Sequence, residues 1–274
     1  MSGDRTAAPT PLGPLAAIAS FARQTAAIAD MEVRKLRHDP TELATRAIQP
    51  ALWLLIFGQV MAHARAVPTG DLAYMDFLVP GILAQSVLFI AIFNGISIIW
   101  ERDLGIVHKF LATPTPRSAL VLGKAVSGGV RSLVQALVVV VLALALGVKL
   151  RWEPAPLAGV VLLILLGAAV FSTFSLIVAC IVKTRERFMG IGQVLTMPLF
   201  FASNAIYPTS IMPGWLRAIS HVNPLTYQVD GLRSLLLAGA AMNGAAIATD
   251  LLVLAATLLV LVVAAARIYP NIVR

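Results

Sequence analysis

The sequence predicts an all-α membrane protein with six transmembrane helices, and three observations support this. Hydrophobic residues make up 59% of the 274 residues, 12% are charged, and the mean hydropathy is +0.87, outside the range of soluble globular domains. Six apolar runs approach the roughly 20 residues that cross a hydrocarbon core. The basic residues are divided unevenly among the segments that separate these runs, as they are in multi-pass membrane proteins.

The chain before the apolar runs has two parts. Residues 1–14 are polar and proline-rich, lack the pattern of a secretory signal peptide, and are expected to form a flexible tail. Residues 15–38 place apolar and charged side chains on opposite sides of one helix, which predicts an amphipathic helix at the membrane interface. Residues 39–274 form the transmembrane domain, and Asp39, Pro40 and Glu42 resemble the cap and first turn of its opening helix.

The distribution of basic residues predicts the orientation of the spans. If both termini are cytoplasmic, most of the 21 lysines and arginines lie in cytoplasmic segments, Arg131 lies within the third span, and the outer segments hold only Arg65, Lys149, Arg151, Arg217 and Arg233. This bias predicts that the N-terminus and the C-terminus are both inside. The predicted spans are 48–64, 78–99, 126–147, 157–182, 190–206 and 246–266.

Residues 100–118, WERDLGIVHKFLATPTPRS, separate the second and third spans. They predict a short water-facing helix with one apolar face, ended by Pro114 and Pro116, because proline lacks an amide proton and disfavours helix in the residue before it. Such a helix can be a docking surface on the cytoplasmic side, where the basic loop 183–187 also lies. On the residues alone, solvated charges at Glu101, Arg102 and Asp103 are an equal alternative.

Residues 207–244 are too long for a simple outer connection and predict two short helices. Pro213 can open the first, and Asn223 and Pro224 supply the N-cap and first residue of a second helix that ends near Gly239. Asp230 and Arg233 in that helix are spaced for an i, i+3 pair. Because neither helix can cross a bilayer, we expect a re-entrant or interfacial hairpin that caps the outer side.

Several kinds of chemistry are disfavoured. The single cysteine, Cys180, and the four scattered histidines offer no metal site, and the sequence contains no G-x-x-x-x-G-K-[ST] phosphate-binding loop. We expect the span cores to hold no Asp or Glu, which argues against ion-coupled transport and against an intramembrane hydrolase, so no catalytic residue is predicted. The net charge of +8 follows from the membrane orientation and does not indicate a nucleic-acid partner.

Polar side chains within the spans have two alternative interpretations. They can line a pathway between two subunits, or they can form interhelical hydrogen bonds worth about 1 kcal/mol or less each. For Arg131, extension of the side chain to the cytoplasmic headgroups is the favoured alternative. The candidate pathway residues are Gln85, Asn94, Arg131, Gln135, Gln193 and Asn204.

The order of these features resembles the permease subunit of an ABC-2 type exporter, and within that family the drug-resistance and Nod-factor export branch. The resemblance extends from about residue 15 to residue 266. It depends on the six spans, the amphipathic N-terminal helix, WERDLGIVHKFLATPTPRSALVLGK after the second span and NPLTYQVDGLRSLLL before the sixth.

The resemblance implies roles for individual residues. A coupling helix that binds in a cleft of a separate ATPase subunit would include Glu101, Arg102, Asp103, Gly105 and Leu111, with the turn back to the membrane formed by Thr113, Pro114 and Arg117. The outer re-entrant motif would include Asn223, Pro224, Tyr227, Asp230 and Arg233. The chain itself would be non-catalytic and hold no cofactor, with ATP and Mg bound by the partner subunit.

The function implied is ATP-driven export of a drug-like, amphipathic or lipid-like substrate across a bacterial cytoplasmic membrane. The expected partners are two copies of a cytoplasmic ABC ATPase, a second permease copy or paralogue, and membrane lipids. One alternative is a polysaccharide or glycolipid exporter, which the four tryptophans and four tyrosines make less favourable because glycan channels are rich in aromatic rings. The other is a membrane anchor or assembly factor that transports nothing.

Overall fold

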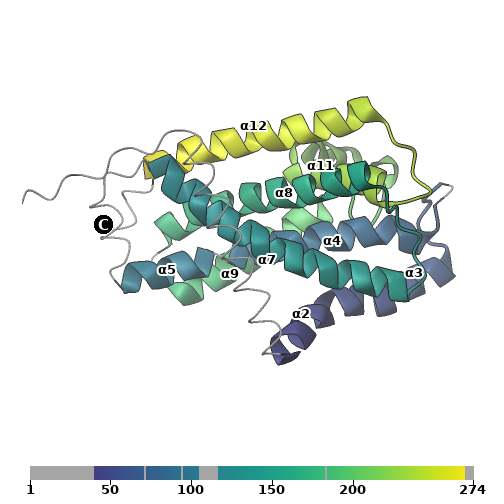
Figure 1. Ribbon diagram of the computed structural model, residues 1–274, viewed down its shortest axis with the longest axis horizontal. Helices are drawn as coiled ribbons and strands as arrows, with labels where there is room; N and C mark the ends of the chain where they lie inside the picture. The colour runs from purple at the N-terminus through teal and green to yellow at the C-terminus, as the bar shows by residue number, and fades with distance from the viewer. Residues whose placement is uncertain (1–39, 71, 94, 105–116, 183, 269–274) are drawn as a thin grey trace, which may run out of the picture.

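The computed structural model describes residues 40–268 except 71, 94, 105–116 and 183. These residues are mainly helical, which confirms the all-α class for this part of the chain (Figure 1). The predicted tail 1–14 and interface helix 15–38 lie outside the described residues. The helices are α2 (Pro40–Leu52), η1 (Trp53–Gly58), α3 (Gln59–Ala64), α4 (Tyr74–Phe93), α5 (Gly95–Asp103), α7 (Arg117–Ala145), α8 (Pro154–Ile181), α9 (Arg185–Phe201), η2 (Thr209–Ile211), α10 (Gly214–Val222), α11 (Pro224–Leu236) and α12 (Gly244–Ile268).

Five helical segments in the described part of the chain are long and apolar enough to cross a membrane. They are the continuous run 47–64 through α2, η1 and α3, the whole of α4, residues 128–145 of α7, and the whole of α8 and α12. The remaining predicted span, 190–206, corresponds to α9, which has 17 residues.

Helix α9 begins and ends earlier than the run 190–206 that hydropathy predicts. It starts at Arg185 because the side chain of Thr184 accepts a hydrogen bond from the backbone N–H of Arg187 at 3.4 Å, which caps the first turn. It ends at Phe201, and Ala202 and the residues after it form turns. The charged residues before the apolar run are therefore helical.

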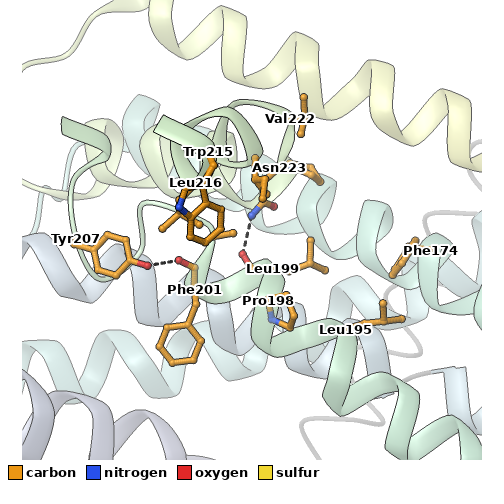
Figure 2. Close-up of a pocket in the computed structure, with 13 residues that line it drawn as sticks. Phe174, Leu195, Pro198, Leu199, Phe201, Tyr207, Trp215, Leu216, Val222 and Asn223 are labelled. Carbon is orange, nitrogen blue, oxygen red and sulfur yellow. Dashed lines mark hydrogen bonds between the residues drawn. The ribbon is translucent and has the colours of Figure 1, made fainter. Parts of the chain in front are cut away.

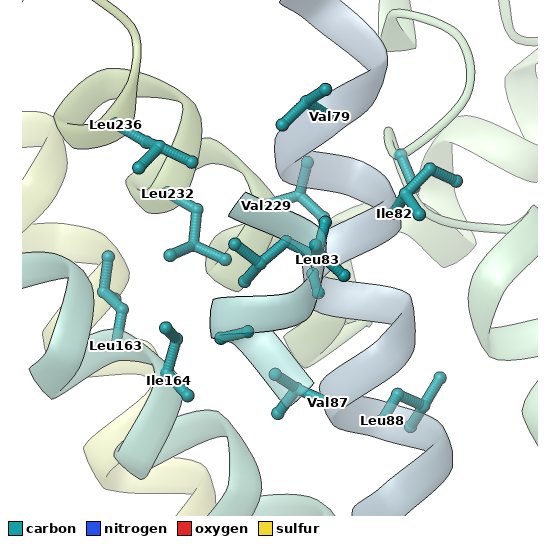
Figure 3. Close-up of a cluster of buried hydrophobic side chains, with 14 of the residues drawn as sticks. Val79, Ile82, Leu83, Val87, Leu88, Leu163, Ile164, Val229, Leu232 and Leu236 are labelled. Atoms are coloured by element: carbon teal, nitrogen blue, oxygen red, sulfur yellow. The ribbon is translucent and has the colours of Figure 1, made fainter. Parts of the chain in front are cut away.

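Helix α4 lies at the centre of the bundle and is buried along nearly its whole length. It packs against α7, α8, α9 and α11, and its side chains interdigitate with those of α8 and α11 (Figure 3). Gly81 permits the close approach of α4 to residue 205, because a Cβ built at Gly81 would lie 2.2 Å from the Ala205 carbonyl oxygen. We call the buried residues around α4 the main core.

A second, smaller group of buried side chains lies apart from the main core. It joins α5, the C-terminal parts of α8 and α12, and the first turn of α9. We call it the α5-end cluster, and its buried members are Ile99, Leu176, Ala179, Cys180, Val182, Phe188 and Ala265. The bundle thus has two cores, and α9 reaches from the smaller one toward the larger.

The opposite end of the bundle, the α11 end, is held by backbone contacts between distant segments. Leu150 and Leu237 form an isolated antiparallel bridge, and the Arg151 N–H donates to the Leu236 carbonyl at 2.8 Å. These contacts pull the chain into an extended conformation, so α11 ends at Leu236 and not near Gly239 as the sequence predicts. The predicted single run 78–99 is likewise divided between α4 and α5.

Candidate functional site

The residues predicted to couple the chain to an ATPase lie at and beyond the end of α5. Asp103 is exposed at the last position of α5. Glu101 and Arg102 belong to the same helix, and Arg117 is the first residue of α7, but their side chains are outside the described part. The other predicted members also lie outside the described residues, and these are Gly105, Leu111, Thr113 and Pro114.

Arg185, the first residue of α9, connects that helix to α5. Its guanidinium lies 3.0 Å from Oδ2 of Asp103 and its Cζ lies 4.0 Å from the centre of the Trp100 ring. The two charged side chains are 37% and 39% exposed, so water screens their attraction. The basic loop 183–187 is predicted on the same side as the docking stretch, but the sequence does not predict the ion pair between Arg185 and Asp103.

Asn223 connects the C-terminus of α9 to the N-terminus of α11. Its Nδ2 donates to the Leu199 carbonyl at 2.7 Å, while its Oδ1 accepts from the Leu225 N–H at 3.0 Å. The side chain thus satisfies one backbone group at each helix end. Pro224 is the first helical residue of α11, so the predicted cap is confirmed.

Tyr227 joins α11 to α10, since its hydroxyl donates to the His221 carbonyl at 2.6 Å. Helix α11 is therefore tied at its start to both helices that precede it. It also packs against α4, α8 and α12, so it belongs to the main core and does more than cover the bundle's end.

The predicted i, i+3 pair in α11 is present and belongs to a larger network. Arg233 lies 3.2 Å from Oδ1 of Asp230, donates to the Asn204 carbonyl at 2.9 Å and places its Cζ 3.9 Å from the centre of the Phe77 ring. Nδ2 of Asn204 donates to the same Asp230 oxygen. The Arg233 side chain is only 13% exposed. This network fixes α11 against α4 and the turn after α9.

Asp250 corrects the expectation that the span cores lack acidic residues. It lies in α12 within the predicted span 246–266 and is 7% exposed. Gly231 of α11 packs nearby, since a Cβ built there would lie 3.5 Å from Oδ2 of Asp250. The run 246–266 is strongly apolar on average, and this average conceals the single carboxylate. The absence of acids therefore no longer argues against ion-coupled transport.

The candidate pathway residues do not share one surface in the described part of the chain. Gln85 of α4 and Gln135 of α7 are buried, and Arg131 is partly buried. Gln193 is exposed on α9, whereas Asn204 is bound to Asp230. Asn94 lies outside the described residues.

An apolar cavity lies between α9 and α10 (Figure 2). It has a volume of about 640 Å³, within the usual range of small-molecule sites. Its wall is almost wholly apolar and comes from α8, α9, the turn after α9, α10 and the start of α11. The lining residues are Phe174, Leu195, Pro198, Leu199, Phe201, Ala202, Tyr207, Trp215, Leu216, Ile219, Val222, Asn223 and Pro224.

Two polar side chains in this cavity wall are engaged in structural hydrogen bonds. Asn223 bridges two helix ends as described above, and the Tyr207 hydroxyl donates to the Phe201 carbonyl. Partial burial raises the pKa of Tyr207 above its ordinary value, so the phenol stays neutral. A molecule in this cavity would therefore bind mainly through apolar contact.

The comparisons with known proteins agree with this architecture. Residues 23–237 match the family described as ABC-2 type transporter. The ycf38 protein of Cyanophora paradoxa, named as a transport permease, is 29% identical over 73% of this chain and 70% of its own length. The daunorubicin resistance ABC transporter permease protein DrrB1 of Streptomyces coeruleorubidus is 27% identical over 73% of this chain and 70% of its own.

A further relative is the inner membrane transport permease YadH of Escherichia coli, which is 25% identical over 70% of this chain and 73% of its own length. The family match covers more than half of the sequence, including the end of α5, the cavity wall and the whole of α11. This chain belongs to the ABC-2 type transporter family.

Proposed function

We propose that this chain is the membrane-spanning permease subunit of an ATP-driven exporter. The observation that carries the proposal is the ABC-2 match over residues 23–237, in a chain with several membrane-length helices and no phosphate-binding loop in its sequence. A permease of this family works with an ABC ATPase, and in the proposed assembly a separate subunit hydrolyses the ATP. ATP and Mg would then bind to that partner.

In the proposed topology α9 is the fifth of six crossings, both termini are cytoplasmic, and α10 and α11 form an outer re-entrant hairpin. Two observations support this arrangement. The α5 end carries Arg185, Arg187 and Arg267, and over the whole sequence most of the lysines and arginines lie in segments assigned to that side, in keeping with the positive-inside rule. Helices α10 and α11 have 9 and 13 residues, too few to cross a bilayer separately.

Coupling would occur where α5 ends. The stretch that begins with Glu101, Arg102 and Asp103 would bind in a cleft of the ATPase, and two permease chains, either two copies or this chain and a paralogue, would each bind one ATPase. The exposed position of Asp103 at the end of α5 supports this assignment. ATP-driven closure of the two ATPases would then displace α5.

The proposed substrate is amphipathic, drug-like or lipid-like, and it would leave the cytoplasmic membrane of a bacterium. The apolar cavity between α9 and α10 supports this class because its wall offers little but apolar surface. The DrrB1 relative is named as a daunorubicin resistance permease, which supports a drug-like substrate. YadH is named as an inner membrane permease, which supports an inner-membrane setting.

Co-purification tests the coupling assignment. We expect Glu101→Ala with Arg102→Ala to abolish association with the partner ATPase while membrane insertion persists. The matched control is Lys149→Ala with Glu153→Ala, because these two residues, one basic and one acidic, are exposed at the opposite end of the bundle. Undiminished recovery of the ATPase with the first double variant would refute the assignment.

Transport in reconstituted vesicles separates an exporter from an anchor. We expect ATP-dependent movement of an amphipathic dye only when permease and ATPase are both present. Stable association without any movement of a panel of drugs, lipids and glycolipids would favour the anchor function instead.

A further inference from the structure

Helix α5 is packed tightly against both α8 and α9. A Cβ built at Gly95 would lie 2.2 Å from Oγ of Ser175 and 2.5 Å from Cζ of Phe188. The Ser175 hydroxyl also donates to the Ile92 carbonyl at the end of α4. Phe188 is fully buried in the α5-end cluster. The start of α5 therefore contacts the first turn of α9 directly.

A second contact joins the other end of α5 to the same turn of α9. Arg185 forms an ion pair with Asp103 and stacks on Trp100, both of which lie in the last turn of α5. An exposed ion pair and an exposed cation–π contact each contribute little to the stability of a fold. The fold does not depend on so small a contribution, so the position of the contact matters more than its stability.

Helix α9 leads from this contact to the apolar cavity. Arg185 is its first residue, whereas Leu195, Pro198 and Phe201 line the cavity near its other end. At 1.5 Å per residue the helix reaches roughly 24 Å from Arg185 to Phe201. A displacement of its first turn would therefore move one wall of the cavity.

Helix α4 offers a poorer route for such a displacement. It is the chain's direct continuation from α5, but it is buried on all sides in the main core, and Gly81 holds it against the Ala205 backbone. Helix α9 has many exposed residues, among them Val194, and it packs less extensively against α4, α5 and α8 than α4 packs against its neighbours, although Trp53 contacts Phe200 and Phe201 near its end. In the described part of the chain α9 therefore has fewer packing restraints than α4.

We propose that Arg185 is a positioning residue that makes α9 follow α5, so that ATPase-driven movement of the coupling stretch reaches the cavity between α9 and α10. This inference rests on the proposed function. Arg185 acts here through Asp103 and Trp100, and it touches neither nucleotide nor substrate.

The test uses the full chain reconstituted with its ATPase in lipid vesicles. Arg185→Gln is compared with Arg187→Gln, which removes the same charge from an exposed position in the same turn of α9. ATPase association, ATP hydrolysis and dye transport are measured on each sample. We expect Arg185→Gln to keep association and hydrolysis but to lower transport per ATP on the order of tenfold, while Arg187→Gln matches the wild type.

Two more variants identify the contact. Arg185→Lys should restore transport only in part, because lysine keeps the charge but loses the planar group that stacks on Trp100. Trp100→Leu should lower transport per ATP in the same direction, and combining it with Arg185→Gln should add little, as expected for two residues in one contact.

The outcomes separate this inference from the function on which it rests. If the wild type binds no ATPase and moves nothing, the proposed function fails and the inference fails with it. If the wild type transports and Arg185→Gln equals Arg187→Gln, only the inference is overturned. Loss of ATPase association in Arg185→Gln would also overturn it, because Arg185 would then be part of the docking surface itself.

Discussion

Two arginines at opposite ends of the bundle make similar contacts in different surroundings. Arg233 pairs with Asp230 and stacks on Phe77, and Arg185 pairs with Asp103 and stacks on Trp100. The Arg233 side chain is 13% exposed and also donates to the Asn204 and Phe77 carbonyls, whereas the Arg185 side chain is 37% exposed.

Because Arg233 is the more buried of the two arginines, its contacts at the α11 end should be harder to break than those of Arg185 at the α5 end. Removing one partner of a buried ion pair typically costs about 3–5 kcal/mol, because the other charge and the bonded carbonyls lose their partners. Breaking an exposed pair costs about 1 kcal/mol or less. The α11 end is therefore the more strongly held of the two, and the α5 end can shift at a smaller cost in free energy, as the proposed transmission of movement requires.

We expect the largest effect from Arg233→Met, which should lower the free energy of unfolding by about 3 kcal/mol. This value is at the low end of the usual range because the Asp230 side chain is 47% exposed and can recover some hydration. Thermal unfolding of the purified variant and wild type in detergent measures the difference in stability. Arg217→Met is the control, since Arg217 in the described part of the chain donates to the nearby carbonyls of Thr209, Ser210 and Met212 and has no carboxylate partner there. Equal losses in the two variants would contradict the contrast.

Gly81→Ala should have the next largest effect, a loss of about 2–3 kcal/mol, because the new methyl group would meet the Ala205 backbone, which cannot rotate away. The matched control is Gly190→Ala in α9. Nothing lies within 4 Å of a Cβ built there, so this change should stabilise the helix by about 0.5–1 kcal/mol. Unfolding temperatures of the two variants should thus move in opposite directions.

Gly95→Ala should cost less than Gly81→Ala, about 1–2 kcal/mol, because the atoms it meets belong to the side chains of Ser175 and Phe188. Phe188→Leu should recover part of the loss when the two changes are combined. Unfolding measurements on the single and double variants check this. A Gly95→Ala loss larger than that of Gly81→Ala would mean that the α5 end is the more rigid one.

Arg185→Gln should have the smallest effect and lower the free energy of unfolding in detergent by at most about 1 kcal/mol. At high salt the difference in stability between variant and wild type should become smaller, because salt screens the exposed ion pair in the wild type. Its unfolding temperature relative to the wild type, at low and high ionic strength, measures this. A loss as large as that of Arg233→Met would show that the α5 contact is structural.

Local sequence signals predicted the features that depend on near neighbours. The Asn223 cap, Pro224 at the first position of α11 and the Asp230–Arg233 pair follow from spacing within one helix. The membrane-length helices follow from hydropathy. Hydropathy does not detect a helical turn made of polar residues, so it does not predict that α9 begins as early as Arg185.

The features that the sequence did not predict join residues far apart in the chain. Arg185 and Asp103 are 82 positions apart, and Asn204 and Asp230 are 26 apart, so no spacing rule relates them. The cavity between α9 and α10 also depends on how helices pack. Asp250 is a different case, because its residue type and position can be read in the sequence. What the sequence does not show is that its side chain is buried beside Gly231 of α11.

Distances between spin labels test most directly whether α9 follows α5. Labels at the exposed positions Leu104 and Met189 report on the junction, and labels at Met189 and Leu259 report on α9 relative to α12, in a Cys180→Ala background with and without ATP and the ATPase. We expect the first distance to stay constant on ATP binding while the second shifts, and we expect Arg185→Gln to broaden the first. A first distance that changes while the second stays constant would contradict the coupling of α5 to α9.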